Sequence, residues 1–551
     1  MSRARAASPV LIASRLAAFV AVAALAACGG GSGSGGGSTG QTVSAGIGCA
    51  LSYTLTDSPV LTGPDPLLAA QWHLRNTGQA GGIAGEDLRA LRAWETTRGA
   101  GVRVAVVDDA IEVVHADLQP NLVAGASYSY RAGNRGSPWP LPCTAETDAY
   151  GSPIDGHGTA VAGLVLGRDD NGLGIAGVAP RASLVAFDAL ASGQDVDIVD
   201  AMLRDNRLNA VYQNSWGSPD DGSLHRAPPA FLQAIRTGVA TGRDGLGSIF
   251  VFPAGNGGCY ARDTNQTCQS DDSNFDGFVN GPGVIAVCAV DDAGRRPFYA
   301  EPGANVLLCA PSSGDAANVA TTTIRGGWRY DFSGTSASTP MVSGVVALML
   351  SANPRLTWRD VRLILAQTAR RNDPLDSGWA VSPDGLAHNH KYGFGVVDAA
   401  AAVARAASWT SVGGTERLRT CTLPERSPGL ALPDAREDGT VSPVSDALAV
   451  PADCGITQIE FVEVTMTATH TYSGDLRVRL RSPAGLVSEL AGSRICAGSG
   501  SDPCGAYTDW TFGSVRHLGE PAPGAWTLEV TDMTPLDAGR LERWSLRIHG
   551  R

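Results

Sequence analysis

The strongest constraint on the fold of this chain is an alternation between about residues 65 and 407. There, short β-branched runs such as residues 102–107 alternate with longer alanine-rich runs such as residues 344–351. A chain that alternates strands with helices folds into an α/β domain with a mainly parallel sheet. We therefore expect such a domain over residues 61–410.

The pattern changes after this region. Residues 408–451 are rich in glycine, proline, serine and threonine, a composition typical of a connection between domains. Four later stretches alternate with a period of two, namely 462–466, 476–480, 526–530 and 544–548. This period predicts antiparallel strands, so we expect residues 411–551 to form an all-β jelly-roll or sandwich.

The first residues have the composition of an export signal. Arg3 and Arg5 precede an apolar stretch, whose uninterrupted part at residues 16–27 is too short for a membrane-spanning helix. The ending before Cys28 resembles a bacterial lipoprotein signal. We expect residues 1–27 to be removed, Cys28 to carry a lipid, and residues 28–60 to be a flexible glycine- and serine-rich linker. The protein would then be exported and held at a bacterial cell envelope membrane; the alternative is a plain signal peptide and a secreted protein.

The charge balance limits the classes of molecule that the protein is expected to bind. Asp and Glu number 54 against 42 Lys and Arg, a net charge of −12. This makes a nucleic-acid partner unfavourable and favours a cationic substrate or bound cations.

The cysteine count agrees with export. Without Cys28, ten of the 11 cysteines remain, enough for up to five disulfides in an oxidising compartment. Their connectivity cannot be derived from the sequence. By proximity we expect Cys259 to pair with Cys268 and Cys496 with Cys504, and a pair between Cys421 and Cys454 is a further hypothesis.

Three motifs together supply a serine hydroxyl and the groups that would activate it as a nucleophile. Asp108 ends an apolar strand, at the sheet edge where active sites gather. His157 opens a helix-compatible stretch, and Ser336 lies just before a long apolar helix whose positive terminus would face it. Each motif alone is weak, but in this order they provide a carboxylate, an imidazole and a hydroxyl.

The segments 104–118, 156–163 and 334–342 resemble the three signature stretches of the subtilase family, in which the same order Asp, His, Ser occurs. The resemblance implies a subtilisin-like serine endopeptidase with Asp108, His157 and Ser336 as its catalytic triad. It also implies that Asn256 and the backbone amide of Ser336 stabilise the oxyanion.

Acidic residues make the chain resemble the kexin and furin branch of that family. Asp109 would face the next-to-last residue before the cut, and Asp220 and Asp276 would line the primary pocket. Two carboxylates in a narrow pocket would pair with an arginine or a lysine of the substrate. The resemblance therefore implies cleavage after basic residues.

Two positions depart from the branch. Arg226 lies about where furin-like enzymes carry an acidic residue for a fourth basic side chain, and Asp200 would substitute for it. Gly156 precedes the histidine, where the branch has a larger residue. We expect a preference for paired basic residues, or for one, and no strict four-residue motif.

The resemblance also implies Ca²⁺, which prefers hard oxygen ligands. One structural site would use side chains and backbone carbonyls of Asp65, Asp117, Arg168, Asn171, Leu173 and Ile175. A second site under the primary pocket would use Asp220, Asp271 and Glu301, whose carboxylates would repel one another without an ion. The sequence does not distinguish Asp271 from Asp272 in this role.

The C-terminal region resembles the P domain of kexin-like convertases at residues 469–476, 482–485, 519–520 and 524–528. We expect it to pack on and stabilise the peptidase domain, with structural roles for His470 and Asp475. The short stretch before Asp65 leaves no room for a folded pro-segment. Folding then needs a helper protein, or calcium and disulfides suffice.

Two other functions remain as alternatives. One is a catalytically idle surface protein that binds partners through its β-domain, against which the intact set of Asp108, His157, Asn256 and Ser336 argues. The other is a broad degradative subtilisin, against which Asp109 and the pocket carboxylates argue. The leading hypothesis requires no organic cofactor.

Overall fold

The structure, a computed structural model, describes residues 41–55, 62–79, 81–147, 153–259, 261–262, 268–313, 318–496 and 504–551. The expected signal peptide and the lipid site at Cys28 lie outside the described residues, so they stay predictions. The expected pair between Cys259 and Cys268 also falls on a segment that is only partly described.

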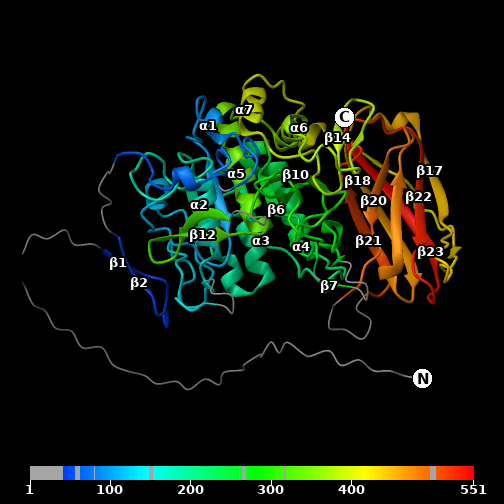
Figure 1. Ribbon diagram of the computed structural model, residues 1–551, viewed down its shortest axis with the longest axis horizontal. Helices are drawn as coiled ribbons and strands as arrows, with labels where there is room; N and C mark the ends of the chain where they lie inside the picture. Colours follow the sequence, from blue (N-terminus) through cyan, green and yellow to red (C-terminus); the bar gives the residue numbers. More distant parts are fainter. Residues whose placement is uncertain are drawn as a thin grey trace, which may run out of the picture. The chain divides into compact units, whose positions relative to one another are not determined.

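A six-stranded sheet forms the centre of the first domain (Figure 1). All of its pairings are parallel, which confirms the predicted α/β class. Its strands, in spatial order, are β10 (Val306–Pro311), β9 (Val284–Val290), β6 (Ile249–Pro253), β5 (Asn209–Asn214), β3 (Arg103–Val107) and β4 (Ser183–Phe187). Every residue of the four strands from β10 to β5 is buried, as expected where both faces of a parallel sheet are covered.

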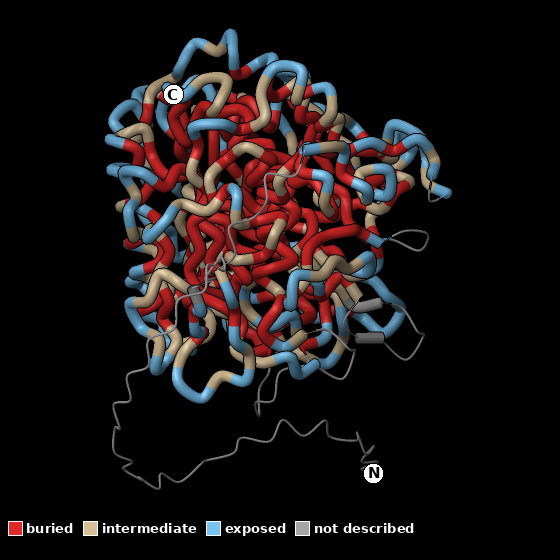
Figure 2. Tube along the Cα trace, turned by 90° about the vertical axis from the view of Figure 1, so that its left-hand side faces the viewer, coloured by how far each residue is buried: buried red, intermediate tan, exposed pale blue. Residues whose placement is uncertain are grey.

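Helices cover the sheet. They are α1 (Ala90–Ala93), α2 (His157–Leu166), α3 (Asp195–Leu203), α4 (Pro229–Thr241), α5 (Thr335–Ala352), α6 (Trp358–Thr368) and α7 (Ala399–Ala407). The long helix α5 packs against β5, β6, β9 and β10, and α2 lies beside it. Among the described residues, α5 is the one helix long and apolar enough to cross a membrane, but 83% of it is buried inside the protein. Figure 2 shows this continuous buried interior.

Three small hairpins complete the first domain. They are β7 (Ala261–Arg262) with β8 (Cys268–Gln269), β11 (Val319–Thr323) with β12 (Gly327–Phe332), and β13 (Ala380–Val381) with β14 (Ala387–His388). The hairpin β11–β12 packs on α2, the helix that begins with His157.

The second domain is an antiparallel β-sandwich, as predicted. One sheet holds β15 (Arg419–Thr422), β16 (Leu430–Leu432), β18 (Ile459–His470), β21 (Tyr507–Ser514) and β23 (Gly539–Gly550). The other holds β17 (Val444–Val450), β19 (Leu476–Arg481), β20 (Val487–Ala491) and β22 (Gly524–Asp532). A core that includes Trp526 and Trp544 fills the space between them.

Two segments differ from the expectation. Residues 41–55, expected to be a flexible linker, form a hairpin of β1 (Gln41–Ser44) and β2 (Ser52–Leu55). The disulfide Cys49–Cys143 and the buried side chain of Tyr53 hold it to the first domain. Residues 408–451, expected to be a connection, contribute β15, β16 and β17 to the sandwich. Prolines and glycines interrupt the period of two there, so the strands were hidden in the sequence.

Four disulfides lie in the described residues. They are Cys49–Cys143, Cys288–Cys309, Cys421–Cys454 and Cys496–Cys504. The last two confirm predicted pairs. Disulfides of this number indicate an exported protein in an oxidising compartment.

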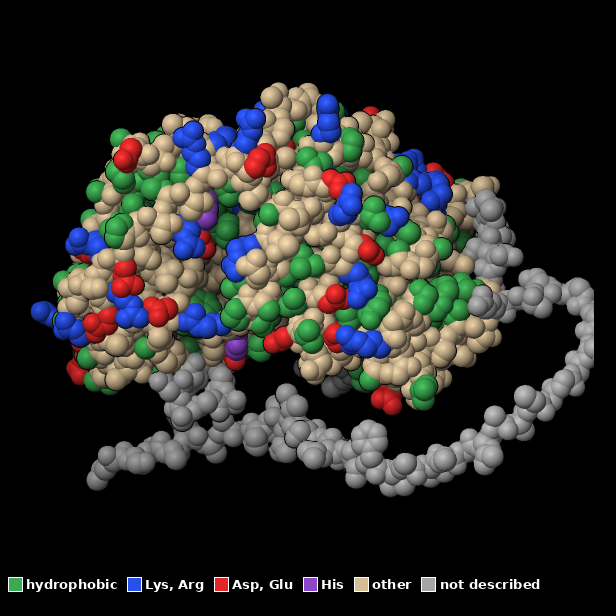
Figure 3. Space-filling view, turned by 180° about the vertical axis from the view of Figure 1, so that it is seen from behind, with side chains coloured by type: hydrophobic (Ala, Val, Ile, Leu, Met, Phe, Trp, Pro, Cys, Tyr) green, Lys and Arg blue, Asp and Glu red, His purple; other side chains and the backbone are tan. Residues whose placement is uncertain are grey.

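The sandwich packs directly on the α/β domain. Phe275 of the first domain belongs to the apolar core of the second. Arg359, which is fully buried, donates two hydrogen bonds to Glu460 across the interface, at 2.6 and 2.9 Å. On the face in Figure 3, basic and acidic side chains are interspersed over both domains.

Candidate active site

Asp108 and His157 form a hydrogen-bonded pair. Asp108 directly follows β3, at the carboxyl edge of the sheet, and is 1% exposed. His157 is the first residue of α2, and its Nδ1 lies 2.8 Å from Oδ1 of Asp108. A buried carboxylate in this position fixes the orientation of the imidazole and leaves Nε2 for a second partner.

The charge state of His157 depends on both neighbouring carboxylates. Burial lowers the pKa of His157, but the charge and hydrogen bond of Asp108 and the charge of Asp109 raise it by more. The net effect is a pKa above the ordinary value, which favours the protonated ring. The ring must lose this proton before it can act as a base, so Asp108 and Asp109 set the pH below which His157 is inactive as a proton acceptor.

Ser336 lies in the first turn of α5. The helix begins after Gly334, whose φ of 79° is in the left-handed region. The Ser336 hydroxyl donates to the carbonyl of Ser215 (3.3 Å), and the Ser215 hydroxyl donates to the carbonyl of Ser336 (3.1 Å). Hydrogen bonds between a nucleophile and its base often form only when a substrate is bound. The nucleophilic role of Ser336 therefore stays a prediction.

Asn256 is fixed through one end of its amide. Its Oδ1 accepts from the backbone N–H of Thr335 (2.8 Å) and from the Thr335 hydroxyl (2.9 Å). Asn256 is otherwise exposed, so these two bonds decide that Nδ2 is the end left for another partner. The motif predicted Asn256, but Thr335, which orients it, was missed because a threonine beside the serine has no distinctive signal of its own.

One pocket brings these groups together with several carboxylates. Its lining includes Asn256, Ser336, Ser215, Asp220, Asp271, Asp276 and Glu301. Asp276 accepts from the backbone N–H and the hydroxyl of Ser218, both at 2.9 Å. Burial raises the pKa of Asp276 by more than its hydrogen bonds to Ser218 and Phe278 lower it. A cationic side chain entering the pocket would relieve this cost.

The other two predicted substrate-binding residues lie outside that lining. Asp109 accepts from the backbone N–H groups of His157 (3.1 Å) and Gly158 (2.8 Å), so it caps α2 beside the histidine. Asp200, on α3, accepts from the Tyr130 hydroxyl (2.6 Å) and pairs with Arg204, the residue directly after this helix. A basic substrate residue would therefore have to compete with Arg204.

The two departures from the convertase pattern have local explanations. Arg226 donates to the carbonyls of Thr508 and Asp509 in the sandwich, so its charge is directed to the domain interface. A Cβ on Gly156 would lie 2.9 Å from Cβ of Pro153 and 3.0 Å from Cγ2 of Ile324. The larger residue of the branch would not fit there without a shift.

The side chains expected to form the first calcium site lie close together. Oδ1 of Asp117 lies 2.8 Å from Nδ2 of Asn171, and the Asp65 carboxylate accepts from the backbone N–H of Asn171. Burial, and then the charge of Asp117 among others, raises the pKa of Asp65 to about 6. Trp328, which the sequence did not single out, donates its indole N–H to Asp117 (2.6 Å). Of the expected carbonyl donors, Arg168 precedes Asn171 in the sequence, and Leu173 and Ile175 follow it.

The second expected site lies under the pocket. A Cβ on Gly257 would lie 2.7 Å from Cβ of Asp271, 3.0 Å from Cβ of Asp220 and 3.0 Å from Oε1 of Glu301. Burial, followed by the charges of Asp271 and Asp220, raises the pKa of Glu301 well above its ordinary value. Converging carboxylates of this kind fit a hard cation chemically. No group of three or more His, Cys, Asp or Glu in the described ranges is arranged as a formed metal site.

The fold and the arrangement of these groups define a subtilisin-like protein with an appended β-sandwich. The chain belongs to the subtilase family, whose model matches residues 99–395, and the model of the proprotein convertase P-domain matches residues 459–548. This confirms the predicted family and branch.

Curated relatives and solved structures agree. Proprotein convertase subtilisin/kexin type 6 of Rattus norvegicus is 34% identical over 88% of this chain, and neuroendocrine convertase 2 of Homo sapiens is 34% identical over 88%. The match spans 50% of the first relative and 74% of the second. The crystal structure of a serine protease of Aeromonas sobria has a TM-score of 0.76 at 26% identity, covering 90% of this chain and 97% of that chain. The structure of that protease with the chaperone ORF2 also has a TM-score of 0.76, at 25% identity over 90% of this chain and 96% of that chain.

Proposed function

We propose that this protein is an exported serine endopeptidase that cleaves peptide bonds after arginine or lysine, with a preference for paired basic residues. The observation that carries the proposal is that Ser336 and Asn256 line the same pocket as Asp220 and Asp276. Chemistry and selectivity for a cation are thereby combined in one cleft.

In this proposal each group has a distinct task. The Ser336 hydroxyl attacks the peptide carbonyl while Nε2 of His157 accepts its proton and Asp108 stabilises the imidazolium. The side-chain amide of Asn256 and the backbone amide of Ser336 donate to the oxyanion. His157 then gives the proton to the leaving amine, and water repeats the cycle on the acyl-enzyme.

Substrate selection is assigned to the carboxylates. Asp276 and Asp220 would bind the basic residue before the cut, and Asp109 would bind the one preceding it. An uncharged side chain in the pocket would leave buried carboxylates unpaired, which costs several kcal/mol in comparable sites, on the order of 2–5 kcal/mol. Asp200 would contribute to a more distant residue only after releasing Arg204.

We also propose that Ca²⁺ stabilises the protein. Its chemistry would be to neutralise the two clusters, the one around Asp65, Asp117 and Asn171 and the one formed by Asp220, Asp271 and Glu301. The raised pKa values of Asp65 and Glu301 support this assignment, because burial and neighbouring carboxylates disfavour their charged forms and a bound cation would offset both effects.

The proposal also covers the domain limits, attachment to a membrane and assistance in folding. The division into a peptidase domain at 61–410 and a P domain at 411–551 agrees with the family matches, which lie inside these limits. A lipid on Cys28 would hold the protein at a membrane. One structural neighbour is a complex of the Aeromonas sobria serine protease with a chaperone, and this supports a helper protein for folding here.

The test compares fluorogenic peptides ending in Lys-Arg and in Ala-Phe, with calcium present. Wild-type protein should cleave the Lys-Arg peptide with much the higher kcat/KM, and Ser336→Ala should abolish cleavage. Preference for Ala-Phe would instead indicate a broad subtilisin, and cleavage that survives in Ser336→Ala would contradict the proposed nucleophile.

A further inference from the structure

The backbone N–H and carbonyl of Gly222 join the pocket to the β-sandwich. Its N–H donates to Oδ2 of Asp271, a pocket residue, at 2.8 Å. Its carbonyl accepts from Nε of Arg494, a residue of the sandwich domain, at 2.5 Å. Gly222 follows Asp220 and Asp221 and has a φ of 76°, which side chains rarely adopt. One hydrogen bond to each domain therefore holds the turn that carries Asp220.

Arg494 is unusually well fixed for an arginine. It is 3% exposed, its guanidinium carbon lies 3.9 Å from the ring centroid of Phe275, and Nη1 donates to the hydroxyl of Tyr507 (2.9 Å). Phe275 also lines the pocket, and it precedes Asp276. Burial raises the pKa of Asp271, and the charge of Arg494 is among the groups that oppose this rise. One guanidinium thus contacts two of the segments that bring carboxylates to the pocket.

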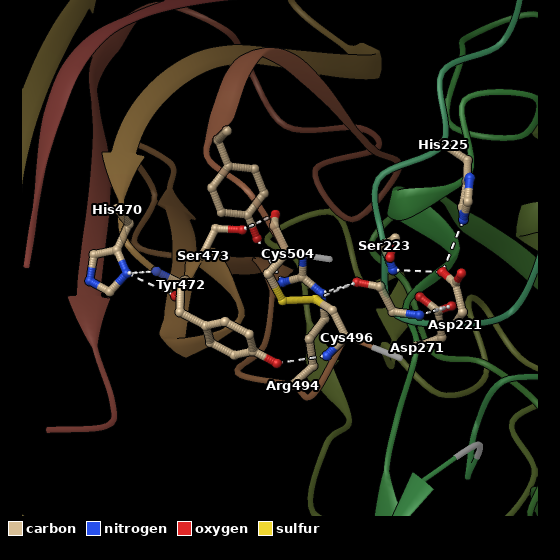
Figure 4. The surroundings of a disulfide bond; sticks show 12 residues. Asp221, Ser223, His225, Asp271, His470, Tyr472, Ser473, Arg494, Cys496 and Cys504 are labelled. Atoms are coloured by element: carbon tan, nitrogen blue, oxygen red, sulfur yellow. Dashed lines mark hydrogen bonds and ion pairs between the residues drawn. A yellow bond between two sulfur atoms is a disulfide. The ribbon is translucent and has the colours of Figure 1, made fainter. Parts of the chain in front are cut away.

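The disulfide Cys496–Cys504 fixes the segment that carries Arg494 (Figure 4). Sγ of Cys496 lies 3.2 Å from the carbonyl oxygen of Gly222, in van der Waals contact, since a disulfide sulfur has no hydrogen to donate. The backbone N–H of Cys496 donates to the Tyr472 hydroxyl (2.9 Å), and the Ser473 hydroxyl donates to the carbonyl of Cys504 (2.7 Å).

Hydrogen bonds within the sandwich domain also fix the turn at residues 472–474. The N–H of Arg494 donates to the carbonyl of Gly474 (2.6 Å). Nδ1 of His470 lies 2.8 Å from the Tyr472 carbonyl, and Nε2 lies 3.2 Å from buried Asp532. A continuous set of contacts therefore runs from the core of the sandwich through Arg494 to Gly222 and the pocket.

We infer that Arg494, held by the Cys496–Cys504 disulfide, is a positioning residue for the primary specificity pocket, so that the β-sandwich domain determines how strongly a basic residue is selected. The inference rests on the proposed function, because it needs a pocket that binds arginine or lysine. Arg494 does not line the pocket. It fixes the Gly222 carbonyl and the Phe275 ring, and through them Asp220 and Asp276.

The conservative variant distinguishes geometry from charge. Lysine keeps the positive charge but lacks the planar fork with which arginine holds Gly222, Tyr507 and the Phe275 ring together. Arg494→Lys should therefore restore part of the function lost in Arg494→Met. A purely structural role in folding would affect all substrates equally, whereas a positioning role should raise KM for the basic peptide alone.

The experiment uses the purified full chain and the two fluorogenic peptides ending in Lys-Arg and Ala-Phe. For Arg494→Met we expect the ratio of the two kcat/KM values to fall about tenfold, mainly through KM for the Lys-Arg peptide, as for the loss of one charge-assisted hydrogen bond. Arg494→Lys and the double variant Cys496→Ser/Cys504→Ser should give smaller falls in the same direction. The matched control is Arg543→Met in the same domain, whose ion pairs with Asp509 and Glu425 lie outside the pocket lining; its ratio should not change.

The outcomes separate the two levels of the account. If wild-type protein shows no preference for Lys-Arg, the proposed specificity fails, and the inference with it. If wild-type protein shows the preference and the ratio is unchanged in Arg494→Met, the inference alone is overturned. Should Arg494→Met not fold, an unchanged ratio in both Arg494→Lys and the double serine variant overturns it.

Discussion

The orientation of Asn256 by Thr335 gives the sharpest quantitative expectation. Two bonds from Thr335 hold Oδ1 of Asn256, and little else fixes this exposed side chain. Asn256→Ala removes an oxyanion donor, which typically costs about 100- to 1,000-fold in kcat, or about 3–4 kcal/mol. Thr335→Val removes the hydroxyl and with it the bonds to Asn256 and to the carbonyl of Gly255. Loss of the bond to Asn256, about 1 kcal/mol, should lower kcat about fivefold. KM should stay nearly constant in both variants, because the donor acts on the transition state.

The assay is steady-state hydrolysis of the Lys-Arg peptide by both single variants and the double variant. Since Thr335 acts through Asn256, adding Thr335→Val to Asn256→Ala should cost nothing further. The control is Thr339→Val in the same helix, whose hydroxyl bonds only to the carbonyl of Thr335. A full fivefold loss from Thr335→Val in the Asn256→Ala background, or a change confined to KM, would refute this reasoning.

Three further predictions test charge, interface and metal. Asp109 raises the pKa of His157, so Asp109→Asn should lower it and move the acidic limb of the kcat/KM profile down by about one pH unit, a shift that pH–rate measurements would detect or exclude. Arg359→Met leaves Glu460 with Arg551 as its remaining partner and should lower the free energy of unfolding by about 3 kcal/mol in urea titrations. A decrease below about 1 kcal/mol would show that the pair contributes no more than an exposed salt bridge. Removing calcium with a chelator should lower Tm, and Ca²⁺ but not Mg²⁺ should restore it; an unchanged Tm would count against the calcium sites.

The parts of the fold that the sequence predicted well are those with local signals. The apolar run of β3 before Asp108, the glycine-flanked His157 at the start of α2, and Ser336 at the start of α5 each depend on a few neighbouring residues. The period of two in β22 and β23 likewise belongs to strands with one face in the core. In such segments the side-chain pattern and the tertiary environment agree.

The parts that the sequence did not predict depend on contacts between distant residues. The hairpin at residues 41–55 is fixed by a disulfide that spans 94 residues. Arg226 and Arg494 look like ordinary surface arginines in the sequence, but each reaches into the opposite domain. The sequence contains no local mark of such contacts, which arise only when the sandwich packs on the α/β domain.

The central claim is that one pocket combines a serine nucleophile with selection for basic residues. The most direct measurement is to digest an unfolded protein substrate with the purified chain and to identify every new terminus by mass spectrometry, with Ser336→Ala as the blank. The account predicts internal cuts after arginine or lysine, most often after paired basic residues, and none with the variant. Cuts spread over apolar residues, or removal of terminal residues alone, would contradict it.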